Sequence, residues 1–249
     1  MGFGYFVFLH RKRRLARKLA VSKVQVETEK WLYDIVLNDN FDIWLNFSAE
    51  VEEAKNYCAT TYRYYFEKEV LLDNFINLKS NILGDVSKRV RDFFILLELD
   101  KYVIDLLDHS DWALKAKAMR VISAMEISRA DKYVAPFLNA KNPILRREAR
   151  LTYVALSPQN LNYFLRKAKT GVSEWEMINI IELINRNKTD YIVVFSPYFN
   201  DVEPSLTILC LRIVKIFKLS DIARIIEGPQ STQGVRRQAP HRHPQAAGA

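Results

Sequence analysis

Apolar residues recur at helical spacing over most of the chain. Between Tyr5 and Ala135 there is no proline and only one glycine, Gly84. Because the two strongest helix breakers are nearly missing, this part of the chain is expected to be mostly helical. The spacing predicts helices at about 12–37, 48–78, 85–97 and 100–108. The polar run at 38–42 predicts a turn, since short polar side chains bond to the local backbone.

In the second half the pattern repeats with a period near 30 residues. Four tyrosines share one local context, at spacings of 31, 30 and 28 residues. A second ladder pairs a large apolar residue with a residue four positions later, at spacings of 31, 30, 31 and 29. The tyrosines are Tyr102, Tyr133, Tyr163 and Tyr191, and the second ladder comprises Leu114 with Ala118, Leu145 with Ala149, Trp175 with Asn179, Leu206 with Cys210, and Val235 with Ala239.

Each period divides into a short helix near the tyrosine and a longer amphipathic helix. In one unit Leu114, Ala118, Val121, Ile122 and Met125 follow helical spacing. The small residue four positions after the first apolar residue permits close helix approach. One helix pair cannot bury its apolar face alone, whereas stacked pairs share a continuous core. We therefore predict an all-α protein, an α-solenoid of antiparallel helix pairs, with the tyrosines as packing residues.

The stretch from Asn142 to Ala149 reads N-P-I-L-R-R-E-A, which resembles the start of a HEAT repeat, D-P-x-V-R-x-x-A. V-R-R-Q-A at 235–239 matches the core of that motif again. HEAT proteins usually carry an Asp–Arg ladder between units; Arg146 and Arg236 fill its Arg position, whereas Lys115, Glu176 and Thr207 depart from it. The resemblance covers residues 83–239. The whole arrangement is also similar to bacterial membrane-anchored HEAT-repeat proteins, and this implies an adaptor without enzymatic activity.

These patterns predict four regions. Residues 1–19 form an apolar and basic juxtamembrane segment, and 20–82 an N-terminal helical region. Residues 83–228 form the HEAT-like array. In 229–249 a repeat begins and is cut short by Pro240 and Pro244, which predicts a truncated unit and a disordered tail.

The net charge of +8 is concentrated at the two ends of the chain. Residues 1–23 hold seven basic and no acidic residues, and 229–249 hold three basic and no acidic residues. The remaining body therefore carries a charge of only −2. A near-neutral body argues against a broad nucleic-acid-binding surface.

An apolar run at 2–9 is followed at once by a membrane-proximal basic cluster. Eight residues as a helix cover about 12 Å, less than the roughly 30 Å of a bilayer core, so the run cannot span a membrane as written. It has the form of the end of a transmembrane helix with a stop-transfer signal, which places the rest at the cytoplasmic face. A solvated basic helix, a nucleic-acid arm and an organelle-targeting peptide are the alternatives. The cluster consists of Arg11, Lys12, Arg13, Arg14, Arg17 and Lys18.

The residues with potential chemistry form no recognisable site. The chain lacks nucleotide-binding loops, zinc-protease and paired-cysteine motifs, and its 7 glycines are too few for most phosphate-binding or Rossmann turns. His109 lies in a D-H-S-D turn suited to capping the next helix. Cys58 and Cys210 indicate a reduced, intracellular protein. We expect no catalytic residue, metal, cofactor or small-molecule substrate.

The pattern favours a non-catalytic protein–protein interaction scaffold held at the cytoplasmic side of a membrane by its N-terminus. Its partner would be another protein, bound by the short helices and the turns between units. The alternative is a helical-repeat nucleic-acid-binding protein that uses the basic termini and a stripe of arginines at 146, 147 and 150. An enzyme with an unrecognised site is a third reading. The candidate protein-binding residues are Lys132, Asn139, Lys141, Arg146 and Arg147.

Overall fold

The computed structural model describes residues 21–38, 41, 48–157, 160–187 and 203–217. Throughout these ranges the chain forms helices and turns, and no strand occurs in them. The chain divides into two compact units, residues 1–193 and 194–249. The predicted all-α class is thus confirmed for the part of the chain that is described.

The N-terminal part contains a helix over 21–36, α3 (Ser48–Thr61), α4 (Tyr65–Asn81) and α5 (Asp85–Leu96). The single helix expected at 48–78 is wrong, because the chain breaks between α3 and α4. Tyr64 is extended (φ −91°, ψ 154°), and its backbone N–H donates to Glu67 Oε2 at 2.9 Å. This bond starts a new helix where neither proline nor glycine marks a stop.

An aromatic cluster fills the core of the N-terminal part. Tyr62 is buried and its hydroxyl lies 2.8 Å from Thr28 Oγ1. The Phe75 and Phe94 rings meet edge to face, with centroids 5.0 Å apart. The aromatic run at 62–66 therefore contributes Tyr62 to the core, whereas Tyr64 in the same run is 66% exposed.

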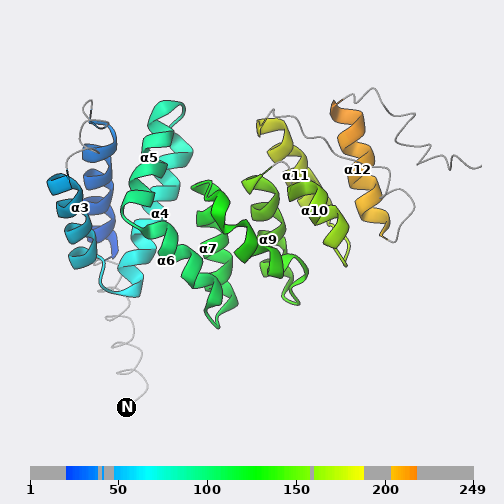
Figure 1. Ribbon diagram of the computed structural model, residues 1–249, viewed down its shortest axis with the longest axis horizontal. Helices are drawn as coiled ribbons and strands as arrows, with labels where there is room; N and C mark the ends of the chain where they lie inside the picture. Colours follow the sequence, from blue (N-terminus) through cyan, green and yellow to red (C-terminus); the bar gives the residue numbers. More distant parts are fainter. Residues whose placement is uncertain (1–20, 39–40, 42–47, 158–159, 188–202, 218–249) are drawn as a thin grey trace, which may run out of the picture. The chain divides into compact units, whose positions relative to one another are not determined.

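Short and long helical segments alternate from residue 99 to residue 187, as the period predicts (Figure 1). The long helix α9 packs against α7 on one side and α11 on the other, and α8, η3 and α10 also pack on α9. The segments are α6 (Leu99–Asp105), η1 (Leu106–Asp108), α7 (Trp112–Ala124), η2 (Ser128–Ala130), α8 (Asp131–Val134), η3 (Ala135–Asn139), α9 (Pro143–Leu156), α10 (Asn160–Lys167) and α11 (Glu174–Asn187).

The long helices begin with the caps that the sequence predicts. Asp111 Oδ1 accepts from Ala113 N at 2.9 Å ahead of α7, and His109 Nδ1 accepts from Asp111 N at 3.0 Å. Asn142 Oδ1 accepts from the first backbone amides of α9, and Pro143 occupies the first helical position. The D-H-S-D turn is thus a capping turn, as expected.

Two helices end in a conformation that normally calls for glycine. Glu98 follows α5 with φ 59°, and Glu126 follows α7 with φ 53°. These residues occupy the left-handed region, which strains any residue with a Cβ atom. The chain therefore has glutamate instead of glycine even at these two helix ends, where glycine would adopt the conformation without strain.

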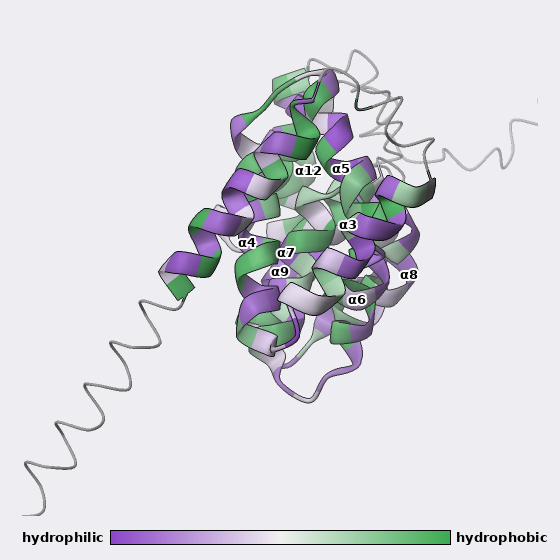
Figure 2. Cartoon of the chain, turned by 90° about the vertical axis from the view of Figure 1, so that its left-hand side faces the viewer, coloured by the Kyte–Doolittle hydropathy of each residue, from purple (hydrophilic) through white to green (hydrophobic). Residues whose placement is uncertain are grey.

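The second unit contains α12 (Pro204–Phe217), in which Leu206, Leu209, Cys210 and Ile213 are buried. These belong to the apolar stripe that the spacing predicts. Figure 2 shows that most labelled helices carry both hydrophobic and hydrophilic residues. Among the helices of the described ranges, none is long and apolar enough to cross a membrane. The N-terminal basic cluster and residues 229–249 lie outside those ranges.

Candidate protein-binding surface

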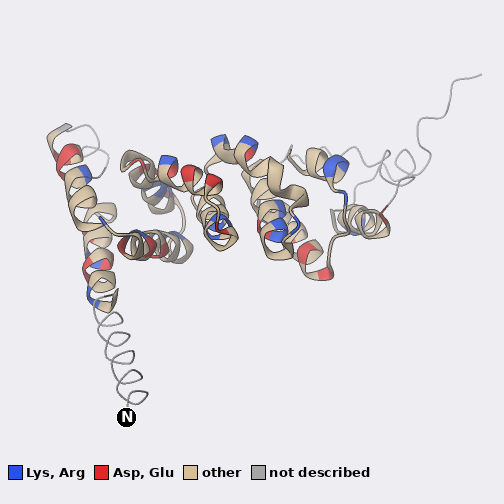
Figure 3. Cartoon of the chain, turned by 90° about the horizontal axis from the view of Figure 1, so that it is seen from below, with Lys and Arg blue, Asp and Glu red and all other residues tan. Residues whose placement is uncertain are grey.

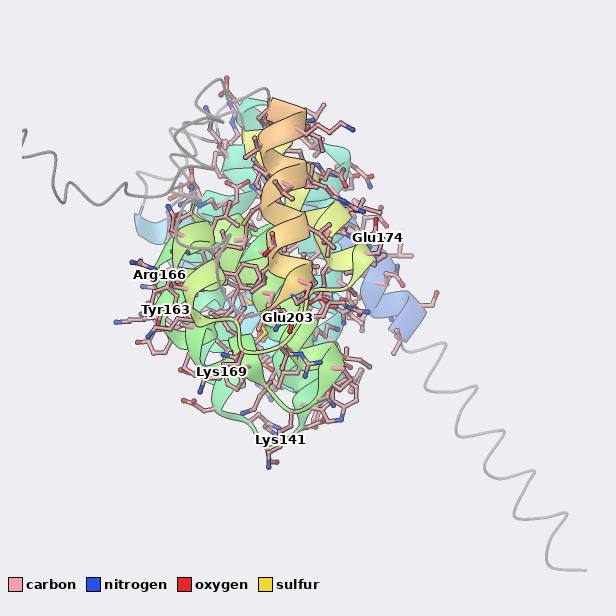
Figure 4. All side chains as sticks on the ribbon, turned by 90° about the vertical axis from the view of Figure 1, so that its right-hand side faces the viewer. Lys141, Tyr163, Arg166, Lys169, Glu174 and Glu203 are labelled. Atoms are coloured by element: carbon pink, nitrogen blue, oxygen red, sulfur yellow. The ribbon has the colours of Figure 1, made fainter. Side chains whose placement is uncertain are left out.

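The five candidate residues lie close together, between α8 and the second turn of α9. Lys132 and Lys141 are exposed, whereas Asn139, Arg146 and Arg147 are half-buried. Lys141 projects from the turn that precedes α9 (Figure 4). The structure therefore presents the predicted residues to solvent unequally.

Asn139 and Arg146 use their polar groups inside the fold. Asn139 Nδ2 donates to Lys167 O at 2.8 Å, and Asn139 Oδ1 accepts from Lys169 N at 2.8 Å. Arg146 Nη1 donates to Ala140 O at 2.8 Å. These bonds fix the turn before α9 and the segment after α10, so both residues have a structural role; their binding of a partner stays a prediction.

Arg147 contributes to the surface through an aromatic neighbour. Its guanidinium carbon lies 4.7 Å from the centroid of the Trp175 ring, and its Nη2 lies 3.2 Å from Glu148 Oε1. Trp175 is nevertheless 50% exposed. The guanidinium thus steadies an indole that still presents much of its area to solvent.

Arg150 is fully buried. The prediction placed it in a surface stripe of arginines and assigned it no structural role. Its guanidinium makes five hydrogen bonds to four residues. Nε donates to Leu138 O, Nη1 to Gly171 O and Glu176 Oε1, and Nη2 to Thr170 O and Oγ1. These partners lie on η3, on the loop after α10 and on α11.

Burial lowers the pKa of Arg150, while the charge and hydrogen bond of Glu176 raise it. Arg150 cannot belong to a solvent-facing arginine stripe, so the nucleic-acid alternative loses that residue. Figure 3 shows basic and acidic residues interspersed along the helices.

The sequence did carry a signal for the burial of Arg150: this residue occupies the position that Met119 holds 31 residues earlier in a buried stripe. A charge at a core position requires partners.

Comparisons with protein-family models, with curated proteins and with solved structures found no match. The likeness to HEAT repeats therefore rests on the sequence pattern. Arg146, which fills the motif's Arg position, bonds to carbonyls of the turn just before its own helix. Arg150, one helical turn later, makes the connection between successive helix pairs.

The tyrosines of the repeat are only partly packing residues. Tyr133 is 44% and Tyr163 is 37% exposed. A lysine ammonium lies over each ring, Lys132 at 4.9 Å from Tyr133 and Lys167 at 5.9 Å from Tyr163. Tyr163 also packs against Tyr153, with ring centroids 5.6 Å apart. Tyr191 lies outside the described residues.

Large apolar side chains are exposed where the long helices begin. Trp112 is 42%, Ile144 is 42% and Trp175 is 50% exposed. Figure 1 shows α7, α9 and α11 starting at the same edge of this unit. We call Trp112, Ile144 and Trp175 the helix-start surface. Of the three, only Trp175 belongs to the ladder that the sequence shows, and its exposure was not visible there.

A groove of about 260 Å³ lies between α7, α9 and α11. Asn179 lines it, at the ladder position that Ala118 and Ala149 occupy on the preceding long helices. Asn179 Nδ2 donates to Trp175 O at 2.7 Å, within the same helix. The charged residues of the groove balance, with Arg120 and Arg186 against Glu148 and Glu182, so it favours no charged ligand. The described residues also contain no group of side chains able to hold a metal ion.

Proposed function

We propose that this protein is a non-catalytic protein–protein interaction scaffold, built as an α-solenoid of HEAT-like repeats. Short and long helices alternate, and Arg150 ties successive helix pairs together through α9, the following loop and α11. Each pair packs on its neighbours, which is the way repeat proteins form a continuous core. This arrangement presents the same end of successive helices to a partner.

The helix-start surface is the observation that carries the proposal. Trp112, Ile144 and Trp175 expose large apolar areas at the starts of successive long helices. Tryptophan and arginine are enriched among the residues that dominate protein interfaces. Arg147 beside Trp175 supplies that combination at one position.

The interaction is tested with a paired variant, Trp112→Ser with Trp175→Ser, expressed at the native level and crosslinked in cells. We expect crosslinked partner proteins to be lost from this variant. The matched control is Tyr64→Ser with Leu83→Ser, which removes two exposed apolar residues elsewhere, 66% and 89% exposed. If both variants crosslink to the same set of partner proteins, the helix-start surface is not the binding site. Salt-sensitive recovery of nucleic acid would favour the alternative function.

We also propose that the N-terminus tethers the scaffold to the cytoplasmic face of a membrane. The proposal rests on the apolar run at 2–9 and the basic cluster that follows it. Fractionation of the complete gene product, with and without residues 1–19, tests it. We expect the membrane fraction to lose the protein on deletion; a soluble protein in both cases would contradict the tether.

A further inference from the structure

A pocket of about 420 Å³ opens between α3, α4 and the junction of α5 with α6. None of its lining residues belongs to the helix-start surface, and the pocket has no role in the proposed scaffold function. Its rim carries the cationic side chains of Lys55, Arg63 and Lys68. Apolar walls are provided by leucines at 71, 97 and 99.

The positive charge of this pocket is compensated only in part. The pKa of Glu98 is lowered by its hydrogen bond and charge interaction with Lys101 and also by the charge of Lys55. Across the described ranges, no carboxylate forms an ion pair with Lys55, Arg63 or Lys68; the Lys68 ammonium instead lies 4.6 Å from the centroid of the Tyr102 ring. The one acidic residue of the lining, Glu98, already pairs with Lys101 at 3.0 Å. A net positive pocket in a nearly neutral body indicates an anionic ligand.

The remaining titratable groups add no negative charge. Burial raises the pKa of the Cys58 thiol to about 11, against a smaller opposing effect of the Lys68 charge. Burial also raises the pKa of Tyr62, whose hydroxyl is bonded to Thr28. Both groups are therefore neutral at pH 7, and the three cations outnumber Glu98, the single carboxylate of the lining.

Two backbone features build the pocket. The break after α3 places Arg63 between two helices instead of within one. The left-handed Glu98, at φ 59°, turns the chain sharply between Leu97 and Leu99, which both line the pocket. Strained backbone of this kind is frequent at ligand sites.

We propose that this pocket binds a phosphate group attached to an apolar organic moiety. Three cations suit a doubly charged phosphate monoester better than a single carboxylate, and lysine and arginine both bond readily to phosphate oxygens. The leucines would contact the organic part. A soluble phosphate ester and a phospholipid headgroup share this chemistry.

Titration calorimetry of the full chain with phenyl phosphate, inorganic phosphate and benzyl alcohol tests the site. We expect phenyl phosphate to bind most tightly, because only it supplies both the charge and the apolar part. In Lys55→Met with Arg63→Met its affinity should fall about tenfold or more, since two charged hydrogen bonds are lost. The control, Lys132→Met with Lys141→Met, removes the same charge elsewhere and should bind normally.

A charge-conserving pair, Lys55→Arg with Arg63→Lys, separates ligand binding from folding and should retain most of the affinity. Binding to phosphatidylcholine vesicles with and without phosphatidic acid identifies the source of the phosphate. If phosphatidic acid increases vesicle binding of the wild type but not of Lys55→Met with Arg63→Met, the ligand is a lipid headgroup. If the variant loses only its binding of phenyl phosphate, the ligand is a soluble ester. Equal affinities in the pocket and control variants, or no binding of phenyl phosphate, would overturn the proposal.

Discussion

Arg150 Nη1 lies 3.2 Å from Glu176 Oε1, and both side chains are buried. Glu176 Oε2 in turn accepts from the backbone N–H and the hydroxyl of Ser173 at 2.8 Å. The pair thereby connects α9 to the start of α11. Three further guanidinium bonds run to the loop between α10 and α11, and Nε donates to Leu138 O on η3.

Replacing Arg150 should be strongly destabilising. In Arg150→Met, Glu176 is left as a buried charge without its cation, and three backbone carbonyls lose their donor. We expect the free energy of unfolding to fall by about 3–5 kcal/mol, measured by guanidinium denaturation. The control is Arg166→Met on the exposed face of α10 (Figure 4), with an expected change within about 0.5 kcal/mol. Similar losses in both variants would refute the role of Arg150.

Glu98→Gly should stabilise the protein, because glycine adopts the left-handed conformation at φ 59° without strain. We expect Tm in a calorimetric scan to rise by about 2 °C. Glu98→Ala removes the same carboxylate but keeps the Cβ atom, so its Tm should not rise. If both variants melt at the same temperature, the backbone is not the source of the effect.

Asn179→Ala should narrow the groove between α9 and α11. It restores the small residue found at Ala118 and Ala149 and improves helix propensity, so we expect a gain of about 0.5–1 kcal/mol in unfolding free energy. Asn185→Ala, on an exposed position of the same helix, gains propensity without new packing. A gain at Asn179 no larger than that at Asn185 would argue against the packing explanation.

The Cys58 thiol should make stability depend on alkaline pH. The folded chain holds this proton up to a pKa of about 11, whereas the unfolded chain releases it near 9.0. The unfolded state therefore binds fewer protons in this interval. The contribution is present below pH 9 and is lost as pH rises, by about 2 kcal/mol at pH 11.

Urea denaturation from pH 8 to pH 11 measures this loss of unfolding free energy. The difference between the wild type and Cys58→Ala separates the contribution of Cys58 from that of Cys210. The variant should lose less stability across the interval. Parallel stability curves for the two proteins would contradict the assignment.

The alternation of helices was predictable because it depends on apolar spacing, as in the stripe of α7 that contains Ala118, Val121 and Ile122. The break before Tyr65 was not, because Tyr62, Arg63 and Tyr64 carry no helix-breaking chemistry. The break results from the Glu67 cap and from Tyr62 entering the aromatic core. These are tertiary effects that override local propensity.

The internal hydrogen bonds of the candidate residues could not be predicted for a related reason. Polarity places Asn139 and Arg146 near the surface, but their partners are backbone carbonyls and an amide. Because almost every residue has these backbone groups, the sequence does not show which of them will accept or donate a hydrogen bond. The exposure of Trp175 was equally hidden, because a large apolar residue on a periodic stripe is usually buried.

Three of the five bonds of Arg150 end on main-chain carbonyls, at Leu138, Thr170 and Gly171. Every amino acid carries that carbonyl. The junction between these helix pairs therefore depends on one arginine and on the path of the loop, and much less on the side chains of the loop. Residues 168–171 can accordingly accept side-chain substitutions that keep this path, with the loss of one bond at Thr170, whereas an insertion would displace the carbonyls that Arg150 binds.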